Sequence, residues 1–256
     1  MLQGLKERLP AAVRAPLSRA YFVARRAVLQ GAGRSLYRGD RVSCPCCGSS
    51  YRKFRALKFD NRMCWSCGSL ERDRLLWLLF DLRPQMLRPD MRMLHIAPEH
   101  ALRPRLRSLP GVRYVEGDLD ARYAHQRIDV TRLDFPDDSF DAILCNHVLE
   151  HVPDDRRAMR ELRRVLRPGG WAILLVPALA EGATDEDPTL ADRAERVRRF
   201  GQHDHVRRYG SDYVDRLEEA GFAVTEEELE GEIDDAAARR YRLYHPQVAD
   251  QLFVCR

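Results

Sequence analysis

The chain has no long apolar stretch and almost no lysine. Its longest apolar runs, Leu75 to Phe80 and Trp171 to Val176, are far shorter than the ~20 residues that a membrane-spanning helix needs. The first residues lack the apolar core and the small-residue cleavage site of a secretory signal peptide, so we expect a cytoplasmic protein without stable membrane insertion. Arginine outnumbers lysine 40 to 3, which indicates a compositional bias as much as a functional one.

Acidic residues are scarce at the start of the chain. Residues 1–62 contain fourteen Lys and Arg against three Asp and Glu, a balance of +11, whereas the remainder carries 29 against 36, a balance of −7. A basic helical segment over residues 1–40 on an acidic body suggests an anionic partner such as RNA, a membrane surface or a phosphorylated substrate. Packing on its own domain, or on a second subunit of a homodimer, is the alternative. The glycines that predict a linker here are Gly31, Gly33 and Gly39.

Cysteine is nearly confined to one segment, since five of the seven lie between residues 44 and 67. Two Cys-x-x-Cys-Gly turns give Cys44, Cys47, Cys64 and Cys67 the spacing CxxC-x16-CxxC. Each turn aims two thiolates at one point, and two such turns complete a tetrahedron around zinc. Four thiolates leave no open coordination position, so the predicted ion is structural, and the two matched turns argue against a redox pair. Cys46 lies inside the first turn and is predicted not to be a ligand.

Five basic side chains lie between the two cysteine turns and suit contact with RNA, a lid or a dimer interface equally. Residues 70–82 are apolar enough to form a buried helix, which Ser69 is expected to cap and which joins the zinc ribbon to the rest of the chain. The basic side chains are Arg52, Lys53, Arg55, Lys58 and Arg62.

A stretch near the middle of the chain reads as strand, loop, helix, turn and strand. Residues 140–145 are apolar-rich and residues 171–176 almost unbroken, as expected where helices cover both faces of a parallel sheet. A helix between them begins at Asp154 or Asp155 and is predicted to end at Pro168-Gly169-Gly170. The stretch predicts half of a doubly wound α/β sheet, in which ligands bind outside the carboxyl ends of the strands.

This stretch resembles the fourth-to-fifth-strand half of class I S-adenosylmethionine-dependent methyltransferases, in which the pattern vLEHvpDD followed by El.RvLrPGG is characteristic. LHIAPE at residues 94–99, FGQHDHVRRYG at residues 200–210 and the cysteine cluster are similar to a bacterial branch of that superfamily. The resemblance covers roughly residues 40–256. It implies a Rossmann-like fold with a mostly parallel seven-stranded sheet whose last strand is antiparallel. Glu150 and His151 occur broadly in the pattern, and we expect them to brace their loop.

The resemblance divides the chain into three parts. Residues 1–40 form the basic segment, residues 41–84 the zinc ribbon with its linking helix, and residues 85–256 the methyltransferase domain. An insertion at residues 178–210 lies on the acceptor side of that domain. Residues 226–240 are expected to be an exposed, acid-rich connection before the last strand.

The turn after the first strand contains no glycine. In ordinary class I methyltransferases this turn is glycine-rich, which lets the backbone approach the cofactor. Here the strand at residues 91–97 ends in Ala97, which is small enough for a close approach, and Pro98 and Glu99 are predicted to open a helix. The resemblance implies that Glu99 accepts from the cofactor ammonium, with a helix first-turn acid as the alternative. His95 belongs to the same turn and is assigned to cofactor binding with it.

Two further turns complete the cofactor site that the resemblance implies. Asp118 follows the second strand and would accept the ribose hydroxyls, with Glu116 as the neighbouring alternative and Leu119 beside it. Asp129 occupies the position where an acid meets the adenine amino group, and Val130 would pack on the ring. A turn acid at a strand end is the alternative reading of Asp129.

Histidine is the residue type best suited to take a proton from an acceptor hydroxyl near neutral pH. Asn146 and His147 lie where the cofactor and the acceptor should meet, and packing on the cofactor is the alternative role for His147. His203 and His205 of the insertion are the other candidate bases. With Asp204 they also suggest a second metal site, against which the alternating faces of an extended segment argue.

The resemblance implies an S-adenosylmethionine-dependent methyltransferase that works by in-line displacement. The protein then positions the acceptor and excludes water. A hydroxyl of a small molecule or sugar is the favoured acceptor, because the insertion is polar and long enough to close a pocket. One alternative is an rRNA or tRNA methyltransferase that contacts RNA through the ribbon. The other is a non-catalytic binding protein whose cofactor site degenerated with the loss of its glycines.

Overall fold

The computed structural model describes residues 31–57, 62–120, 122–177, 179–227, 229, 231–243 and 251–256. The basic helix predicted at the start of the chain, up to residue 30, and Lys58 lie outside the described residues. Residues 31–36 are helical. Within them, Gly33 packs so closely on Trp65 that a Cβ would lie 2.0 Å from the indole ring, and Gly39 lies in a strand. The linker predicted at these glycines is therefore wrong.

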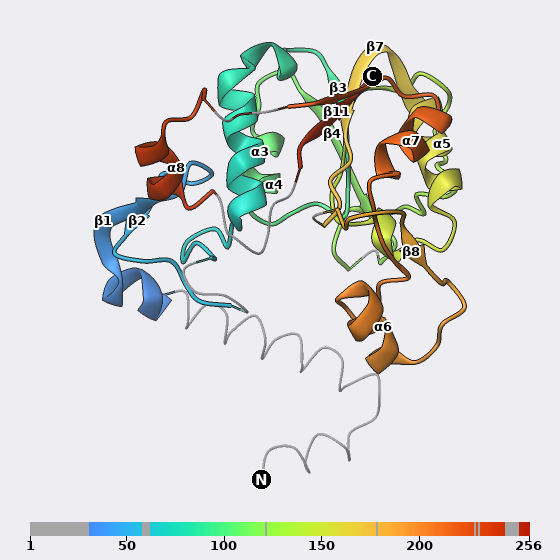
Figure 1. Cartoon of the computed structure of the whole chain (residues 1–256). Coiled ribbons are helices and arrows are strands. Elements are labelled where there is room, and N and C mark those ends of the chain that lie inside the picture. Colours follow the sequence, from blue (N-terminus) through green and yellow to red (C-terminus); the bar gives the residue numbers. More distant parts are fainter. Residues whose placement is uncertain are drawn as a thin grey trace, which may run out of the picture.

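A seven-stranded sheet forms the centre of the fold (Figure 1). The strand order is β10-β11-β7-β6-β3-β4-β5, and β11 alone among the described strands of this sheet runs in the direction opposite to the other strands. The predicted sheet with a reversed last strand is confirmed. Its strands are β3 (Arg92–Ile96), β4 (Arg113–Asp118), β5 (Gln126–Arg127), β6 (Phe140–Cys145), β7 (Leu166–Ile173), β10 (Val224–Glu226) and β11 (Phe253–Cys255).

Strand order determines where a ligand can bind. The chain adds β4 and β5 on one side of β3 and then returns to place β6 on the other side. In open α/β sheets a crevice forms at the carboxyl ends of the strands where the order reverses in this way. The carboxyl ends of β3 and β6 are therefore the centre of the expected site.

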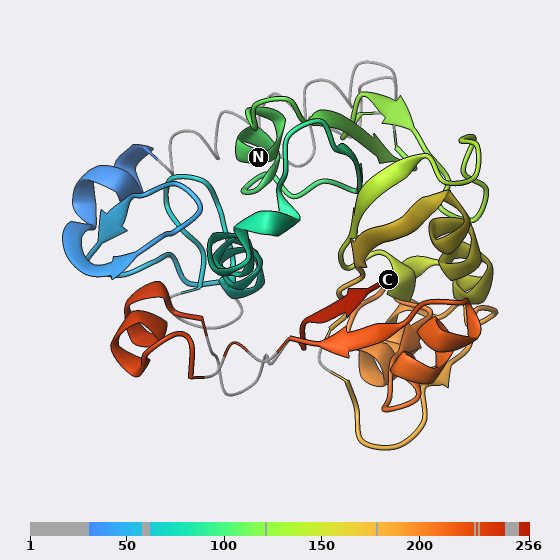
Figure 2. The same cartoon turned by 90° about the horizontal axis from the view of Figure 1, so that it is seen from above.

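Helices cover both faces of the sheet, and a small two-stranded ribbon lies beside it (Figures 1 and 2). None of the described helices is long and apolar enough to cross a membrane. One face carries α3 (Glu71–Leu82), η1 (Pro84–Met86) and α4 (Arg103–Arg107), and the other η2 (Leu149–His151), α5 (Asp155–Val165) and α7 (Tyr213–Glu219). The remaining elements are ribbon strands β1 (Arg38–Ser43) and β2 (Ser50–Tyr51), insertion elements β8 (Asp185–Glu186), α6 (Arg193–Phe200) and β9 (Arg207–Arg208), and α8 (Asp235–Tyr241).

Successive residues of the central strands point into different cores, as strand geometry requires. Met93 belongs to the core that contains Trp77 of α3, whereas Leu94 belongs to the core that contains Met159 of α5. The core on the α3 face also contains Phe54 and other buried ribbon residues. The ribbon and the sheet therefore share one apolar interior, with α3 between them as the predicted joint.

Element boundaries agree with the sequence at β6 and differ at the helix that follows. Asp154 caps α5, because its carboxylate accepts the N–H of Arg157 at 3.0 Å. The helix ends at Val165, however, and Leu166 already pairs with Phe140 as the first residue of β7. The predicted helix end at Pro168 is wrong because the residue before a proline disfavours helical backbone, so the chain becomes extended earlier.

Two predicted helix starts are also wrong. Leu70 is the N-cap of α3, and its N–H is satisfied by the carboxylate of Asp73 at 2.8 Å. The Ser69 hydroxyl instead lies 3.0 Å from Sγ of Cys44. After β3, the helix expected to begin at Glu99 begins only at Arg103, after a turn.

The connection predicted to be exposed contains α8, which packs against β1 of the ribbon. Both views place this helix beside the ribbon and α3 (Figures 1 and 2). The guanidinium of Arg74 on α3 is fully buried and joins the two parts. It donates to the carbonyls of Tyr241 at 2.6 Å and Arg242 at 2.8 Å, and to that of Ser69 at 2.8 Å.

Candidate functional site

The turn after β3 places a carboxylate between two strand ends. Ala97 has a φ of 47°, in the left-handed region that glycine enters most readily. Beyond it, Oε1 of Glu99 accepts from Nδ2 of Asn146 at 2.9 Å, and Oε2 lies 2.5 Å from Nε2 of His95. Because Asn146 follows β6, the Glu99 carboxylate links the ends of the two strands at which the strand order reverses.

His95 stands behind Glu99 instead of facing the crevice. Its side chain is fully buried, and Nδ1 lies 2.8 Å from the hydroxyl of Tyr114 on β4. Burial alone would raise the pKa of Glu99, but the nearby His95 and the hydrogen bonds from His95 and Asn146 hold that pKa below its ordinary value. Glu99 is therefore an anion at neutral pH, and His95 is the residue that positions it.

The end of β4 carries the acid that the sequence assigns to a ribose. Asp118 is the last residue of the strand, and its carbonyl accepts the N–H of Ile128 at 2.9 Å. Leu119, the next residue, is 62% exposed. The alternative acid, Glu116, is buried and paired with Arg103. Asp118 is therefore the carboxylate that stands at the strand end.

The segment after β5 lies beside the end of β4. The Asp129 carboxylate is exposed and accepts the N–H and the hydroxyl of Thr131, and these hydrogen bonds lower the pKa of Asp129. Val130 is buried, with 6% of its surface exposed. The hydrogen bond between Ile128 and Asp118 keeps this segment next to the end of β4.

His147 follows Asn146 at the end of β6 and adopts a φ of 53°. Its N–H donates to the carbonyl of Leu175 at 2.7 Å, which fixes the backbone of the turn. Its ring Nδ1 lies 3.4 Å from Oε1 of Glu150. Burial would raise the pKa of Glu150, but the hydrogen bond from His147 and the proximity of His147 and His151 hold it below its ordinary value.

The two histidines of the insertion lie in different surroundings. His203 is exposed, whereas His205 is buried, with 8% of its surface exposed. Nδ1 of His205 lies 3.0 Å from the carbonyl oxygen of Phe200. Burial lowers the pKa of His205. The structure brings His205 to Glu150 and His151, so the His-Asp-His run does not act as one unit. No local pattern predicts this contact, because the two segments are far apart in the chain.

The four ligand cysteines predicted for zinc converge. Sγ of Cys44 lies 3.6 Å from that of Cys67, and Sγ of Cys47 lies 3.7 Å from that of Cys64. All four sulfur atoms lie within 4.8 Å of one another, and a tetrahedron of thiolates 2.3 Å from zinc would space them about 3.8 Å apart. Cys46 turns away, and its Sγ lies 3.4 Å from the carbonyl of Asp73.

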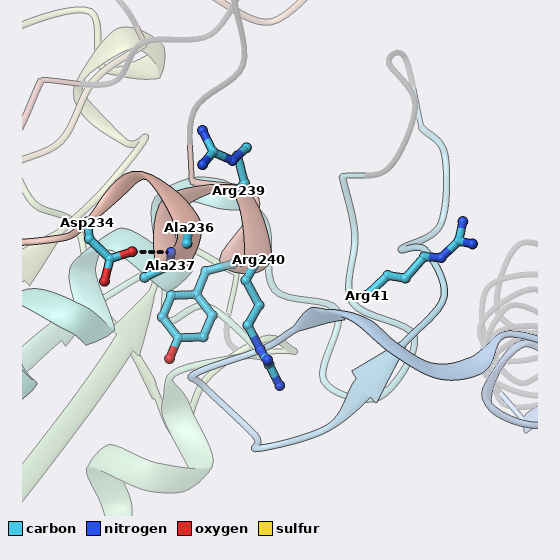
Figure 3. Close-up of a pocket in the computed structure, with 7 residues that line it drawn as sticks. Arg41, Asp234, Ala236, Ala237, Arg239 and Arg240 are labelled. Carbon is cyan, nitrogen blue, oxygen red and sulfur yellow. Dashed lines mark hydrogen bonds between the residues drawn. The ribbon is translucent and has the colours of Figure 1, made fainter.

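A pocket of about 480 Å³ lies away from the strand ends, between β1 and α8. Figure 3 shows Arg239 and Arg240 pointing in different directions from α8, with Arg41 set apart on the ribbon. The carboxylate of Asp234 caps the helix by accepting the N–H of Ala237 at 2.7 Å. The arginines do not converge on a common point, so this pocket is a basic surface and not a built anion site.

The sequence comparisons match the part of the chain that carries this site. Residues 87–174 match the methyltransferase domain family. The chain is 35% identical over 114 residues to 27-O-demethylrifamycin SV methyltransferase of Amycolatopsis mediterranei, a match covering 43% of this chain and 39% of that protein. It is 43% identical over 75 residues to the uncharacterized methyltransferase YcgJ of Bacillus subtilis, covering 29% of this chain and 28% of that protein. The chain therefore matches well under half the length of these relatives.

The fold comparison extends further than the sequence matches. A crystal structure of an S-adenosylmethionine-dependent methyltransferase from Mesorhizobium loti superposes with a TM-score of 0.50 at 17% identity, covering 73% of this chain and all of that one. The chain thus shares the Rossmann-like fold of that class I methyltransferase structure, with the same kind of mostly parallel seven-stranded sheet. The methyltransferase-family match spans β3 to β7, which includes the turns that carry Glu99, Asp118 and His147.

Proposed function

We propose that this chain is an S-adenosylmethionine-dependent methyltransferase whose acceptor is a hydroxyl of a small molecule or sugar. The observation that supports this most directly is the Glu99 carboxylate, which His95 and Asn146 hold between the ends of β3 and β6. A fixed anion at the reversal point of a class I methyltransferase sheet suits the ammonium of an amino-acid-bearing cofactor. The methyltransferase-family match over the same strands supports it independently.

The residues present fit this cofactor. Ala97 takes the left-handed backbone of a glycine turn, so the missing glycines do not block a close approach. Asp118 at the end of β4 would accept the ribose hydroxyls, with Leu119, Asp129 and Val130 around the adenine. S-adenosylmethionine supplies an electrophilic methyl group on its sulfonium. The chain orients the acceptor and keeps water from that group.

Among the candidate bases, His147 fits the role best. It follows Asn146 directly at the end of β6, and Glu150 pairs with its Nδ1 at 3.4 Å. A carboxylate at one imidazole nitrogen holds the ring in one orientation and one tautomer. His203 is exposed and His205 is held by the carbonyl of Phe200. We expect His147 to take the proton of the acceptor hydroxyl.

We also propose that the cysteine cluster binds zinc as a structural ion. The sulfur spacings are those of a tetrahedral thiolate site, and four thiolates leave no position for a substrate. Both turns repeat the same backbone pattern, in which the glycine N–H of Gly48 or Gly68 donates to the carbonyl of the first cysteine. The ion would hold together a ribbon whose strands are otherwise short.

The test is calorimetry with S-adenosylhomocysteine, followed by transfer of labelled methyl to a panel of hydroxylated acceptors. The intact protein should bind the product cofactor, and Asp118→Asn should weaken binding by about tenfold or more, because a charged hydrogen bond contributes about 1.5–3 kcal/mol. His147→Ala should lower kcat by about 10²-fold or more with little change in cofactor affinity. Absence of S-adenosylhomocysteine binding would overturn the proposal in favour of a non-catalytic binding protein.

RNA as the acceptor is the competing outcome of the same test. Two ribbon cations already have partners, since Arg52 donates to the carbonyl of Leu36 at 2.5 Å and the Lys53 ammonium lies 5.6 Å from the centroid of Tyr37. This favours a small acceptor. A salt-sensitive RNA shift that disappears when Arg52, Lys53 and Arg55 are neutralised would favour an RNA methyltransferase.

A further inference from the structure

Two segments far apart in the chain bring a carboxylate and two imidazoles together. Glu150 and His151 belong to η2, and His205 lies in the loop after α6. One ligand atom from each of these side chains lies within 4.8 Å of the other two. The rings of His151 and His205 meet edge to face, with centroids 4.7 Å apart.

A backbone hydrogen bond and the side chain of a buried arginine hold the two segments in this relation. The N–H of Val206 donates to the carbonyl of Glu150 at 2.9 Å. The guanidinium of Arg207, which is 1% exposed, donates to the carbonyls of Leu149 at 2.7 Å and Pro153 at 2.9 Å, and to that of Val152. The contacts that hold the cluster are therefore buried and do not depend on side chains meeting at the surface.

In each histidine, Nδ1 has a hydrogen-bond partner, which leaves the other ring nitrogen as the possible metal ligand. Nδ1 of His205 lies 3.0 Å from the carbonyl of Phe200, so it carries the proton and leaves the lone pair on Nε2. Nδ1 of His151 lies 3.3 Å from the carbonyl and 3.7 Å from the carboxylate of Asp204. Metal-bound histidines in proteins almost always donate their other ring N–H to a carbonyl or carboxylate in this manner.

The carboxylate of Glu150 has an oxygen that the protein does not satisfy. The residue is 1% exposed, and Oε1 faces Nδ1 of His147 at 3.4 Å. Oε2 is buried and has no hydrogen-bond partner among the described residues. An unsatisfied buried acceptor, more so on a charged group, destabilises a protein, so a partner is expected at this oxygen.

We infer that Glu150, His151 and His205 bind a divalent transition-metal ion. Two imidazoles and one carboxylate suit zinc, iron(II), manganese or cobalt, whereas magnesium and calcium prefer oxygen ligands alone. Ligands about 2.1 Å from one ion lie about 3.0–3.4 Å apart, so binding draws the cluster together by on the order of 1 Å. His151, whose side chain is 33% exposed, has room for that movement.

An ion at this position keeps coordination sites open. Three protein ligands are typical of catalytic metal sites, whose remaining position takes water or substrate. Glu150 also faces His147, so the ion would lie beside the proposed base, where a bound acceptor hydroxyl would lose its proton more easily. This role rests on the proposed methyltransferase activity, whereas binding of the ion does not.

The test uses the full chain loaded with one equivalent of zinc, which the four thiolates are expected to bind first, and then titrated with cobalt(II). The expected result is a second ion per chain that gives visible d–d absorption without a thiolate-to-cobalt charge-transfer band. Glu150→Gln and His151→Ala should abolish this second binding event. His203→Ala is the matched control, because it removes an exposed histidine of the same loop, and it should bind both ions.

Circular dichroism of each variant verifies that it is folded, and His151→Ala keeps the test valid if Glu150→Gln does not fold, because His151 is partly exposed. Failure of the intact protein to bind any cobalt beyond the cysteine site would overturn the inference. Unaltered cobalt binding by folded His151→Ala and Glu150→Gln would do the same. Calorimetry with S-adenosylhomocysteine on the same samples separates the two proposals, since cobalt binding without cofactor binding rejects only the methyltransferase.

Discussion

Replacing Glu99 by glutamine tests the cofactor site with little change in shape. The glutamine oxygen can still accept from Nδ2 of Asn146, as Oε1 of Glu99 does at 2.9 Å. Its amide nitrogen would face Nε2 of His95, which can become an acceptor if Nδ1 donates to Tyr114 at 2.8 Å. The substitution therefore removes a negative charge and keeps the hydrogen-bond frame that holds the turn.

The expected loss follows from the surroundings of the carboxylate. The Glu99 side chain is only 14% exposed, so water screens its charge weakly. A hydrogen bond to a charged group contributes about 1.5–3 kcal/mol. Taking about 2 kcal/mol, the dissociation constant of S-adenosylhomocysteine should rise roughly 30-fold.

Calorimetric titration of the intact protein and Glu99→Gln measures this directly. Asp138→Asn is the matched control, because it removes the same charge from an exposed turn. That turn precedes the amino end of β6, whereas Asn146 follows its carboxyl end. Asp138 has a φ of 54°, which asparagine tolerates. A Glu99→Gln affinity within twofold of the intact protein would refute the assignment of Glu99 to the cofactor ammonium.

Three further results are expected. Cys64→Ser should abolish the proposed zinc binding and lower the thermal midpoint, whereas Cys46→Ser should still bind the metal, since Cys46 is turned to a backbone carbonyl; metal analysis and calorimetry measure both. Gly117→Ala should destabilise the protein by about 1–3 kcal/mol in urea unfolding, because the added Cβ would lie 2.1 Å from Cδ1 of Ile128, and Ile128→Ala should partly restore stability in the double variant. Because the folded-state pKa of Glu99 is lowered, its contribution to stability is complete above the unfolded value of about 4.3 and is lost as the pH falls through the lower folded value. Urea unfolding between about pH 7 and pH 3 should therefore show a smaller loss for Glu99→Gln than for the intact protein.

Local patterns predicted the parts of the fold that local chemistry determines. The run Phe140–Cys145 is β6 residue for residue, and Asp154 caps the next helix. Each cysteine turn is closed by its own backbone hydrogen bonds, so its shape could be predicted locally, and the two turns do converge. Two predicted helix boundaries were wrong. Ser69 contacts Cys44 instead of capping α3, and the helix before Pro168 ends early because the residue before a proline disfavours helical backbone.

Long-range partners account for most of what the sequence did not predict. Glu99 looks like a first-turn acid until the fold brings Asn146 to it. His203 and His205 are two residues apart and suggest one site, yet one is exposed and the other buried. The buried Arg207 has no local signal, because arginine ordinarily lies at the surface.

The hydrogen bonds of the buried Arg74 guanidinium also have a consequence for biosynthesis. Two of its acceptors, the carbonyls of Arg62 and Ser69, emerge from the ribosome with it, whereas those of Tyr241 and Arg242 emerge 167 and 168 residues later. Until then the cysteine ribbon is exposed on the side that α8 will cover. A ribbon sensitive to proteases is therefore the expected mark of a nascent chain whose translation stopped before α8.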